Sequence, residues 1–139
     1  MLSCLDPVQR EIARIALEKL ISSGKIHPQR IDEALGQSEK EVEKSVWRAG
    51  NEAIATIGIG KIHPDLIRTL GKLSDRTSYG QNVLNHSKEV AMLCSSMAAE
   101  LKMDTKLARR AGLMHDIGKA VSQSLSLIHI SEPTRQLAI

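Results

Sequence analysis

The chain has 139 residues, of which 42% are hydrophobic and 25% are charged, and its net charge is +3. This length suffices for one domain or for parts of two. The mild positive charge permits contact with a polyanion without indicating one. Trp47 and Tyr79 are the only aromatic residues, which argues against an aromatic platform on which bases stack.

The sequence also argues against a disulfide-rich secreted protein and against a membrane-spanning protein. Cys4 and Cys94 form no paired motif, so we expect free or buried thiols in a reducing compartment. No run of about 18 apolar residues occurs, and no membrane span is predicted. The first residues lead directly into a capped helix, so no signal peptide is predicted.

The first predicted element is a helix that begins at Asp6-Pro7 and ends at Gly24. Asp is a favoured N-cap, Pro fits the first helical position, and Gly suits a left-handed C-cap. Apolar residues follow a helical period along it, namely Val8, Ile12, Ile15, Ala16 and Leu20. They cover much of its surface, so we expect a packing partner that the chain does not contain.

The sequence Gly-Lys-Ile-His-Pro occurs twice, at 24–28 and at 60–64, and each copy predicts the start of a helix. His27 and His63 are therefore interpreted as residues beside helix N-termini, not as metal ligands. Residues 28–57 are predicted as one helix of about 45 Å, with bends expected near Gly36 or Gly50. Its predicted stripe is Ile31, Leu35, Val42, Val46, Ala49 and Ala53. A bridge between modules, a dimer seam and a solvated linker all remain open.

The next segment is predicted as a short helix, 64–73, followed by a polar loop, 74–80. Four residues of this loop supply donors for a phosphate near the candidate metal site, namely Arg76, Thr77, Ser78 and Tyr79. All four can equally be cap and turn residues.

Two helices then bring together three candidate metal ligands. His86 lies on the first, with a predicted buried stripe of Val83, Val90, Leu93, Cys94, Met97 and Leu101. The second is capped by Asp104 or Thr105 and ends on His115-Asp116, and Gly118 is expected to break it. If the helices are antiparallel, His86 faces His115-Asp116. This mixed nitrogen and oxygen set suits Zn, Mn or Fe better than Ca or Mg. The alternative is that His86 packs or caps and His-Asp is an ordinary polar step.

Basic residues surround this candidate site. Lys106, Arg109 and Arg110 are interpreted as a solvated face of the second helix. Lys119, one turn after Asp116, is the better candidate for contact with a substrate phosphate, as a point charge.

His86 followed by His115-Asp116-Ile-Gly-Lys resembles the opening of the HD superfamily of metal-dependent phosphohydrolases. The longer runs at 76–91, 97–101 and 108–113 resemble the ribonuclease Y family in particular. Residues 6–20 are similar to the closing helix of the KH RNA-binding domain of that family.

The resemblance implies an all-α fold, a helical connector followed by the first helices of an HD-domain bundle. It implies a KH remnant at 1–23, the connector at 24–73 and the N-terminal part of an HD domain at 74–124. Residues 125–139 resemble a translated sequencing adapter, so we expect a non-native tail whose His129 is no ligand.

The resemblance also implies a function: a metal-dependent endoribonuclease that cleaves single-stranded RNA and initiates mRNA decay. The implied metal ligands are His86, His115 and Asp116, for a divalent ion (Mn, Mg or Zn). His115, Asp116 and Lys119 would be catalytic, and Arg76 and Lys119 would bind substrate. The family's later Asp ligand has no counterpart here, so we expect weak metal binding and little or no hydrolysis by this chain alone.

The family's partners and location follow as expectations. Its full-length members are expected to be homo-oligomers, to join an RNA-degradation complex and to lie on the cytoplasmic side of the bacterial membrane through an N-terminal anchor. One alternative is a cyclic-dinucleotide phosphodiesterase of the HD-GYP type, although the usual Ile-Gly-x-Pro-Asp-like stretch does not follow Lys119. Another is a non-catalytic helical fragment that dimerises or scaffolds.

Overall fold

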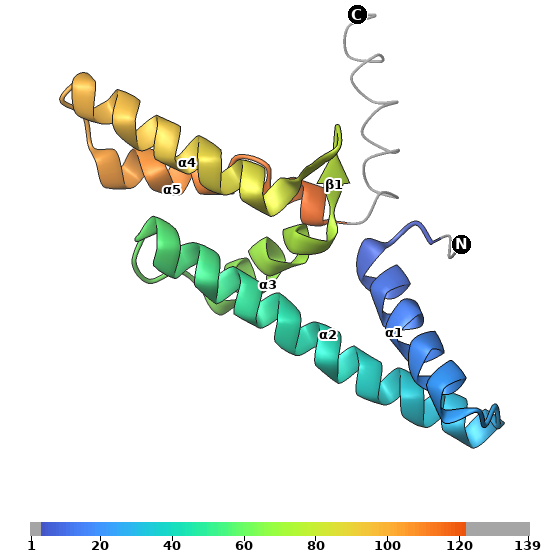
Figure 1. Cartoon of the computed structure of the whole chain (residues 1–139). Helices are drawn as coiled ribbons and strands as arrows, with labels where there is room; N and C mark the ends of the chain where they lie inside the picture. Colours follow the sequence, from blue (N-terminus) through green and yellow to red (C-terminus); the bar gives the residue numbers. More distant parts are fainter. Residues whose placement is uncertain (1–3, 122–139) are drawn as a thin grey trace, which may run out of the picture.

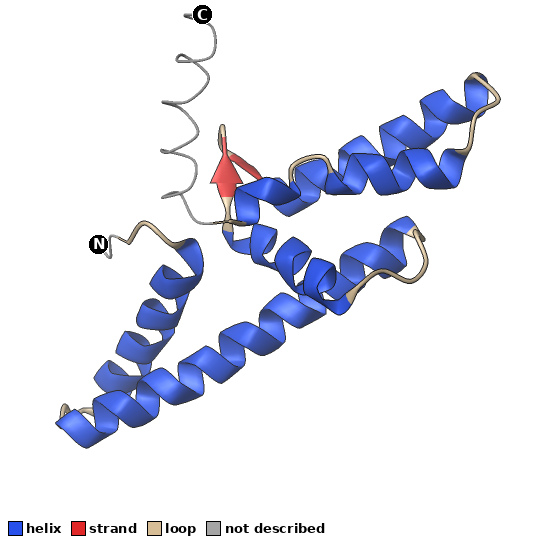
Figure 2. Ribbon diagram, turned by 180° about the vertical axis from the view of Figure 1, so that it is seen from behind, coloured by secondary structure: helices blue, strands red, loops and turns tan. Residues whose placement is uncertain are grey.

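The computed structural model describes residues 4–121, and this part of the chain is all-α apart from one small hairpin, as predicted. In Figures 1 and 2, a pair of helices stands at each end of the molecule with a short helix between them. The elements in order are α1 (Pro7–Ser23), α2 (Pro28–Ile57), α3 (Pro64–Gly71), the 3-10 turn η1 (Lys72–Asp75), β1 (Thr77–Ser78), β2 (Gln81–Asn82), α4 (Val83–Glu100), α5 (Thr105–Met114) and the 3-10 turn η2 (Ile117–Ala120).

The helix α1 has the ends that its sequence predicts. The Asp6 side chain accepts a hydrogen bond from the Val8 amide at 3.0 Å, and Gly24 adopts a left-handed φ of 64°. The buried face of α1 packs on α2, where Ile12 forms a small cluster with Val42 and Val46. Since α1 finds this partner within the chain, part of its apolar surface is covered by α2.

The long helix α2 begins and ends where the sequence predicts, but its buried face is shifted. Leu35, placed in the stripe, is exposed, whereas Ala34 and Ser38 are buried. The buried residues recur mainly every four positions, because α1 packs along the first half of α2 and α3 along the second. The helix α2 therefore connects the α1 end of the molecule to the α3 end.

Two glycines let α2 and α3 cross closely. A Cβ on Gly50 would run into the carbonyl group of Ile67, and a Cβ on Gly71 into the carbonyl group of Val46. Gly50 lowers the intrinsic stability of α2, but at this position only hydrogen fits against the neighbouring backbone. The crossing thus fixes α3 on the second half of α2.

The main core lies where α2, α3, α4, α5 and η2 meet. Its buried residues are Ala53, Ile57, Ile59, Leu70, Leu73, Val83, Leu84, Ala91, Leu113 and Ala120. Arg109 closes one side of this core by donating from its guanidinium to the Ile57 carbonyl at 3.1 Å. The interpretation of Arg109 as part of a solvated face is therefore wrong, because its half-buried side chain caps the C-terminal end of α2.

The helix α4 buries a different face from the predicted one. Leu93, Met97 and Leu101 are 63%, 64% and 66% exposed. The face that packs on α5 instead carries smaller residues, among them Ser87 and Ala91. Placing these three large side chains in the core was wrong, because amphipathic periodicity does not say which of two apolar faces meets a neighbour within the chain.

A two-residue hairpin occupies the segment predicted as a polar loop. β1 and β2 pair antiparallel with Thr77 opposite Asn82 and Ser78 opposite Gln81. The turn residues Tyr79 and Gly80 have φ values of 53° and 77°, the signature of a type I′ turn. Tyr79 is fully exposed at its tip. The loop prediction missed this hairpin because Tyr is an unusual residue at a left-handed position.

Within residues 4–121, no helix is long and apolar enough to cross a membrane. The predicted non-native tail at 125–139, with His129, lies outside the described residues.

Candidate metal centre

The first turn of α4 and the end of α5 place the three predicted ligands side by side. Gly112 on α5 lies against α4 so closely that a Cβ there would be 2.8 Å from the Ala91 Cα atom. This contact aligns the two helices near His86. α5 ends at Met114, so His115 and Asp116 follow it directly. Gly118, which was expected to break the helix, lies within η2, four residues after the last residue of α5.

His86, His115 and Asp116 form a compact cluster. Each offers one ligand atom, and these atoms all lie within 4.8 Å of one another. The two imidazole rings meet edge to face with centroids 5.4 Å apart. Ligands at about 2.0–2.2 Å from a shared zinc ion lie roughly within this span, so the donor set fits a transition-metal cation.

The orientation of His115 favours an open ligand atom. Its Nδ1 atom lies 2.7 Å from the Gly112 carbonyl oxygen, so in the tautomer that donates to this carbonyl Nε2 is the free ligand atom. Nε2 lies 3.2 Å from Asp116 Oδ2, close enough for both atoms to bind one cation. A backbone carbonyl behind a ligating histidine is the usual support of a metal-bound imidazole.

Asp116 is ionised by its surroundings. Lys119 Nζ donates to Asp116 Oδ2 at 2.8 Å. This hydrogen bond, with the nearby positive charge of Lys119 and the two histidines, holds the pKa of the Asp116 carboxyl below its usual range, although partial burial opposes the shift. An ionised carboxylate is the form that binds metal.

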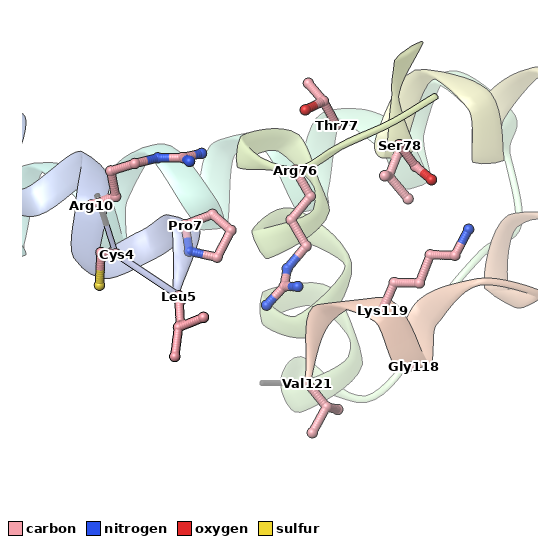
Figure 3. Close-up of a pocket in the computed structure, with 11 residues that line it drawn as sticks. Cys4, Leu5, Pro7, Arg10, Arg76, Thr77, Ser78, Gly118, Lys119 and Val121 are labelled. Carbon is pink, nitrogen blue, oxygen red and sulfur yellow. The ribbon is translucent and has the colours of Figure 1, made fainter. Parts of the chain in front are cut away.

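The two predicted phosphate-binding residues lie near one another, and one of them contacts this cluster. Arg76 and Lys119 both line a pocket of about 580 Å³ between α1, the hairpin and η2 (Figure 3). A second pocket of about 190 Å³ includes His86, Tyr79 and Lys119 among its lining residues. The structure thus brings Arg76 and Lys119 to one pocket, and Lys119 to the side of His86.

His27 and His63 lie at helix N-termini, as predicted. His27 is the N-cap of α2, and the His63 ring accepts a hydrogen bond from the Asp65 amide at 3.2 Å. Neither belongs to the metal-binding group found among residues 4–121.

Two contributors to the site escaped sequence reasoning. The first is the Gly112 carbonyl, which supports His115 from three residues earlier on the same helix. The second is Arg10 of α1, which lines the larger pocket. Tyr79, one of the loop residues predicted to lie near the metal site, lines the smaller pocket beside His86. No local signal relates Arg10 to residues so far along the chain.

Comparison with known proteins gives one consistent family. The HD-domain family model matches residues 83–136. The chain is 56% identical over 129 residues to the ribonuclease Y proteins of Thermotoga petrophila and Thermotoga maritima, a match of 93% of this chain and 25% of each relative. It is 54% identical over 130 residues to ribonuclease Y of Listeria innocua, with 94% of this chain and 25% of that protein covered.

The chain spans about a quarter of the length of these curated relatives. No solved structure gives a significant match. The HD-domain match runs into the segment predicted to be a non-native tail, whose origin stays a prediction, as do the segment boundaries at 23, 73 and 124.

Proposed function

Because this chain is a homologue of a segment of ribonuclease Y, we propose that it carries part of the metal centre of an RNA-cleaving hydrolase. The observation that supports this most directly is the cluster of His86, His115 and Asp116, whose ligand atoms lie within 4.8 Å of one another. The reaction class is hydrolysis of a phosphodiester bond in single-stranded RNA, as the first step of mRNA decay.

The three clustered side chains hold a divalent cation in this proposal. His86 and His115 supply imidazole nitrogens, and Asp116 supplies a carboxylate oxygen. These donors suit Zn or Mn. Of the three expected ions, Mg has the weakest preference for imidazole ligands. A divalent cation there supplies Lewis acidity, which makes water a better nucleophile near neutral pH and offsets charge on phosphoryl oxygens.

The chain's own residues position the substrate. Lys119 hydrogen-bonds Asp116 and lies beside His86 in the smaller pocket, where its ammonium group can exchange the carboxylate for a scissile phosphate. Arg76 offers a planar guanidinium that matches phosphate geometry. The Gly112 carbonyl holds the His115 ring and its proton in place.

Three protein ligands leave this centre incomplete as a hydrolytic site. A fourth ligand, the later Asp of the family, is not found at this cluster among residues 4–121. We therefore infer that the chain alone binds metal weakly and hydrolyses little or no RNA. Homo-oligomerisation, an RNA-degradation complex and a membrane anchor on the cytoplasmic side are proposals for the longer protein.

A calorimetric titration with Mn²⁺ and Zn²⁺ tests the centre in this chain. His115→Ala and Asp116→Asn are expected to lower metal affinity by at least about tenfold. His63→Ala is the matched control, because His63 is exposed and lies at the N-terminus of α3. Equal uptake by wild type and Asp116→Asn would refute the assignment.

Activity is measured on a longer ribonuclease Y chain that contains this segment. Alanine at the counterpart of Asp116 is expected to abolish cleavage of single-stranded RNA. Retained RNA cleavage in that variant, or turnover of cyclic dinucleotides and not RNA, would contradict the proposed reaction.

A further inference from the structure

A basic pocket lies beside the metal cluster, between the start of α1 and the β1–β2 hairpin. Its volume is about 580 Å³, and its cations come from three separate segments. Figure 3 shows them around it: Arg10 from α1, Arg76 from the residue before β1, and Lys119 from η2. Among the described residues that line it, none carries a carboxylate. Because Lys119 is paired with Asp116 outside the lining, Arg10 and Arg76 supply most of the positive charge of the pocket.

Arg76 lines this pocket, and its guanidinium group does not make all of its hydrogen bonds within the described residues. Its Nε atom is buried and has no partner there, and an unpaired buried donor is unfavourable. The flat guanidinium group places its donors in a fork that matches two oxygens of one phosphate. The pocket therefore suits an oxyanion with more than one acceptor oxygen.

The basic pocket adjoins a smaller pocket beside His86. Ser78, Val83 and Lys119 line both this pocket and the smaller pocket that includes His86. A chain-like ligand can thus have one group near His86 and a neighbouring group beside Arg76. A single small anion would use only one of the two pockets.

We propose that the basic pocket binds a phosphodiester group of single-stranded RNA that neighbours the one at the metal cluster. Arg10 and Arg76 hold this neighbouring phosphate, and Lys119 lies at the boundary between the two pockets. Recognition is through the backbone, because the pocket lining within residues 4–121 contains cations and hydroxyl groups and no aromatic ring. This inference rests on the proposed function, which names RNA as the substrate.

Fluorescence anisotropy tests the pocket with a labelled oligouridylate of about 10 nucleotides, a length within the site sizes of single-strand binders. The 139-residue chain is titrated in EDTA, so that no metal is required for binding. Arg10→Gln and Arg76→Gln are compared with Arg30→Gln. Arg30 is exposed at the first turn of α2, beside a different pocket, so its replacement removes the same charge elsewhere.

Arg10→Gln and Arg76→Gln are each expected to weaken binding several-fold at low salt. Each is also expected to flatten the slope of log affinity against log salt by about 0.7, the value for one lost phosphate contact on a single strand. Arg30→Gln should leave both quantities at the wild-type values. Arg10 is exposed, so its variant keeps the test decisive if Arg76→Gln does not fold.

Wild-type binding by Arg10→Gln, or an equal loss in Arg30→Gln, would overturn the proposal in favour of diffuse attraction to a basic surface. Metal uptake is measured separately and without RNA. If the wild-type chain takes up no metal but Arg10→Gln weakens its RNA binding, the basic pocket is supported and the proposed metal centre is refuted.

Discussion

Replacing Gly112 by alanine should destabilise the chain and its site together. The added Cβ would lie 2.8 Å from the Ala91 Cα atom, 3.0 Å from the Ala91 nitrogen and 3.1 Å from the Val90 carbonyl oxygen. These are backbone atoms, so relief requires α4 and α5 to separate. Overpacking costs typically about 1–3 kcal/mol, and alanine recovers up to about 1 kcal/mol of helix propensity. We expect a net loss of about 1 kcal/mol, with about 2 kcal/mol as the upper limit.

Urea denaturation followed by circular dichroism measures this change, and the chain contains its own control. Gly36 lies within α2, and a methyl group added there would have no neighbouring atom within 4 Å. Gly36→Ala should therefore stabilise the chain by roughly 0.5–1 kcal/mol. If Gly112→Ala is as stable as Gly36→Ala, the close packing of α4 on α5 is wrong.

The same variant has a consequence for the metal cluster. The Gly112 carbonyl supports the His115 ring, and the α4–α5 contact sets the position of His86 relative to it. Gly112→Ala should thus lower Mn²⁺ affinity under conditions where the chain is still folded. If the metal affinity is unchanged while the stability falls, the positions of the ligands do not depend on the packing of α4 on α5.

Three further changes test other parts of the structure. Arg109→Ala removes the donor to the Ile57 carbonyl and should cost about 1.5–3 kcal/mol of unfolding free energy, whereas Lys106→Ala on the same helix should cost little in the same denaturation assay. Burial raises the pKa of the Asp75 carboxyl. The contribution of Asp75 to the free energy of unfolding is therefore present below the pKa of the unfolded state and is lost as the pH rises through the pKa of the folded state. Asp75→Asn should thus stabilise the chain at neutral pH and match wild type in acid, and urea midpoints at both pH values check this. Leu93, Met97 and Leu101 leave an apolar face of α4 exposed, and we expect copies of the chain to associate through it. Met97→Lys should therefore reduce self-association in analytical ultracentrifugation, and an unchanged distribution would contradict association through this face.

Much of the fold follows from local signals in the sequence. Asp6-Pro7 and Gly24 define α1, and the two prolines after His27 and His63 begin α2 and α3. Each signal acts within a few residues of the backbone groups that it satisfies. The approach of His86 to His115 and Asp116 was also predictable, because two apolar helices joined by a short turn pack antiparallel.

What the sequence left undetermined depends on contacts between distant segments. The exposure of Leu93 and Met97 depends on which face of α4 meets α5. Arg109 caps α2 from 52 positions away, and Arg10 reaches the basic pocket only because α1 folds back along α2. Periodicity gives the faces of a helix but not the identity of its neighbours.

Binding of one metal ion by both His86 and His115 is tested most directly by NMR of the imidazole rings. Long-range ¹H–¹⁵N spectra of the histidine rings are recorded as substoichiometric Mn²⁺ is added. If His86 and His115 share one metal ion, their rings should broaden first and together, while those of His27 and His63 remain sharp. Equal broadening of all five histidine rings of the chain, or sharp signals from His86 and His115, would contradict a shared site.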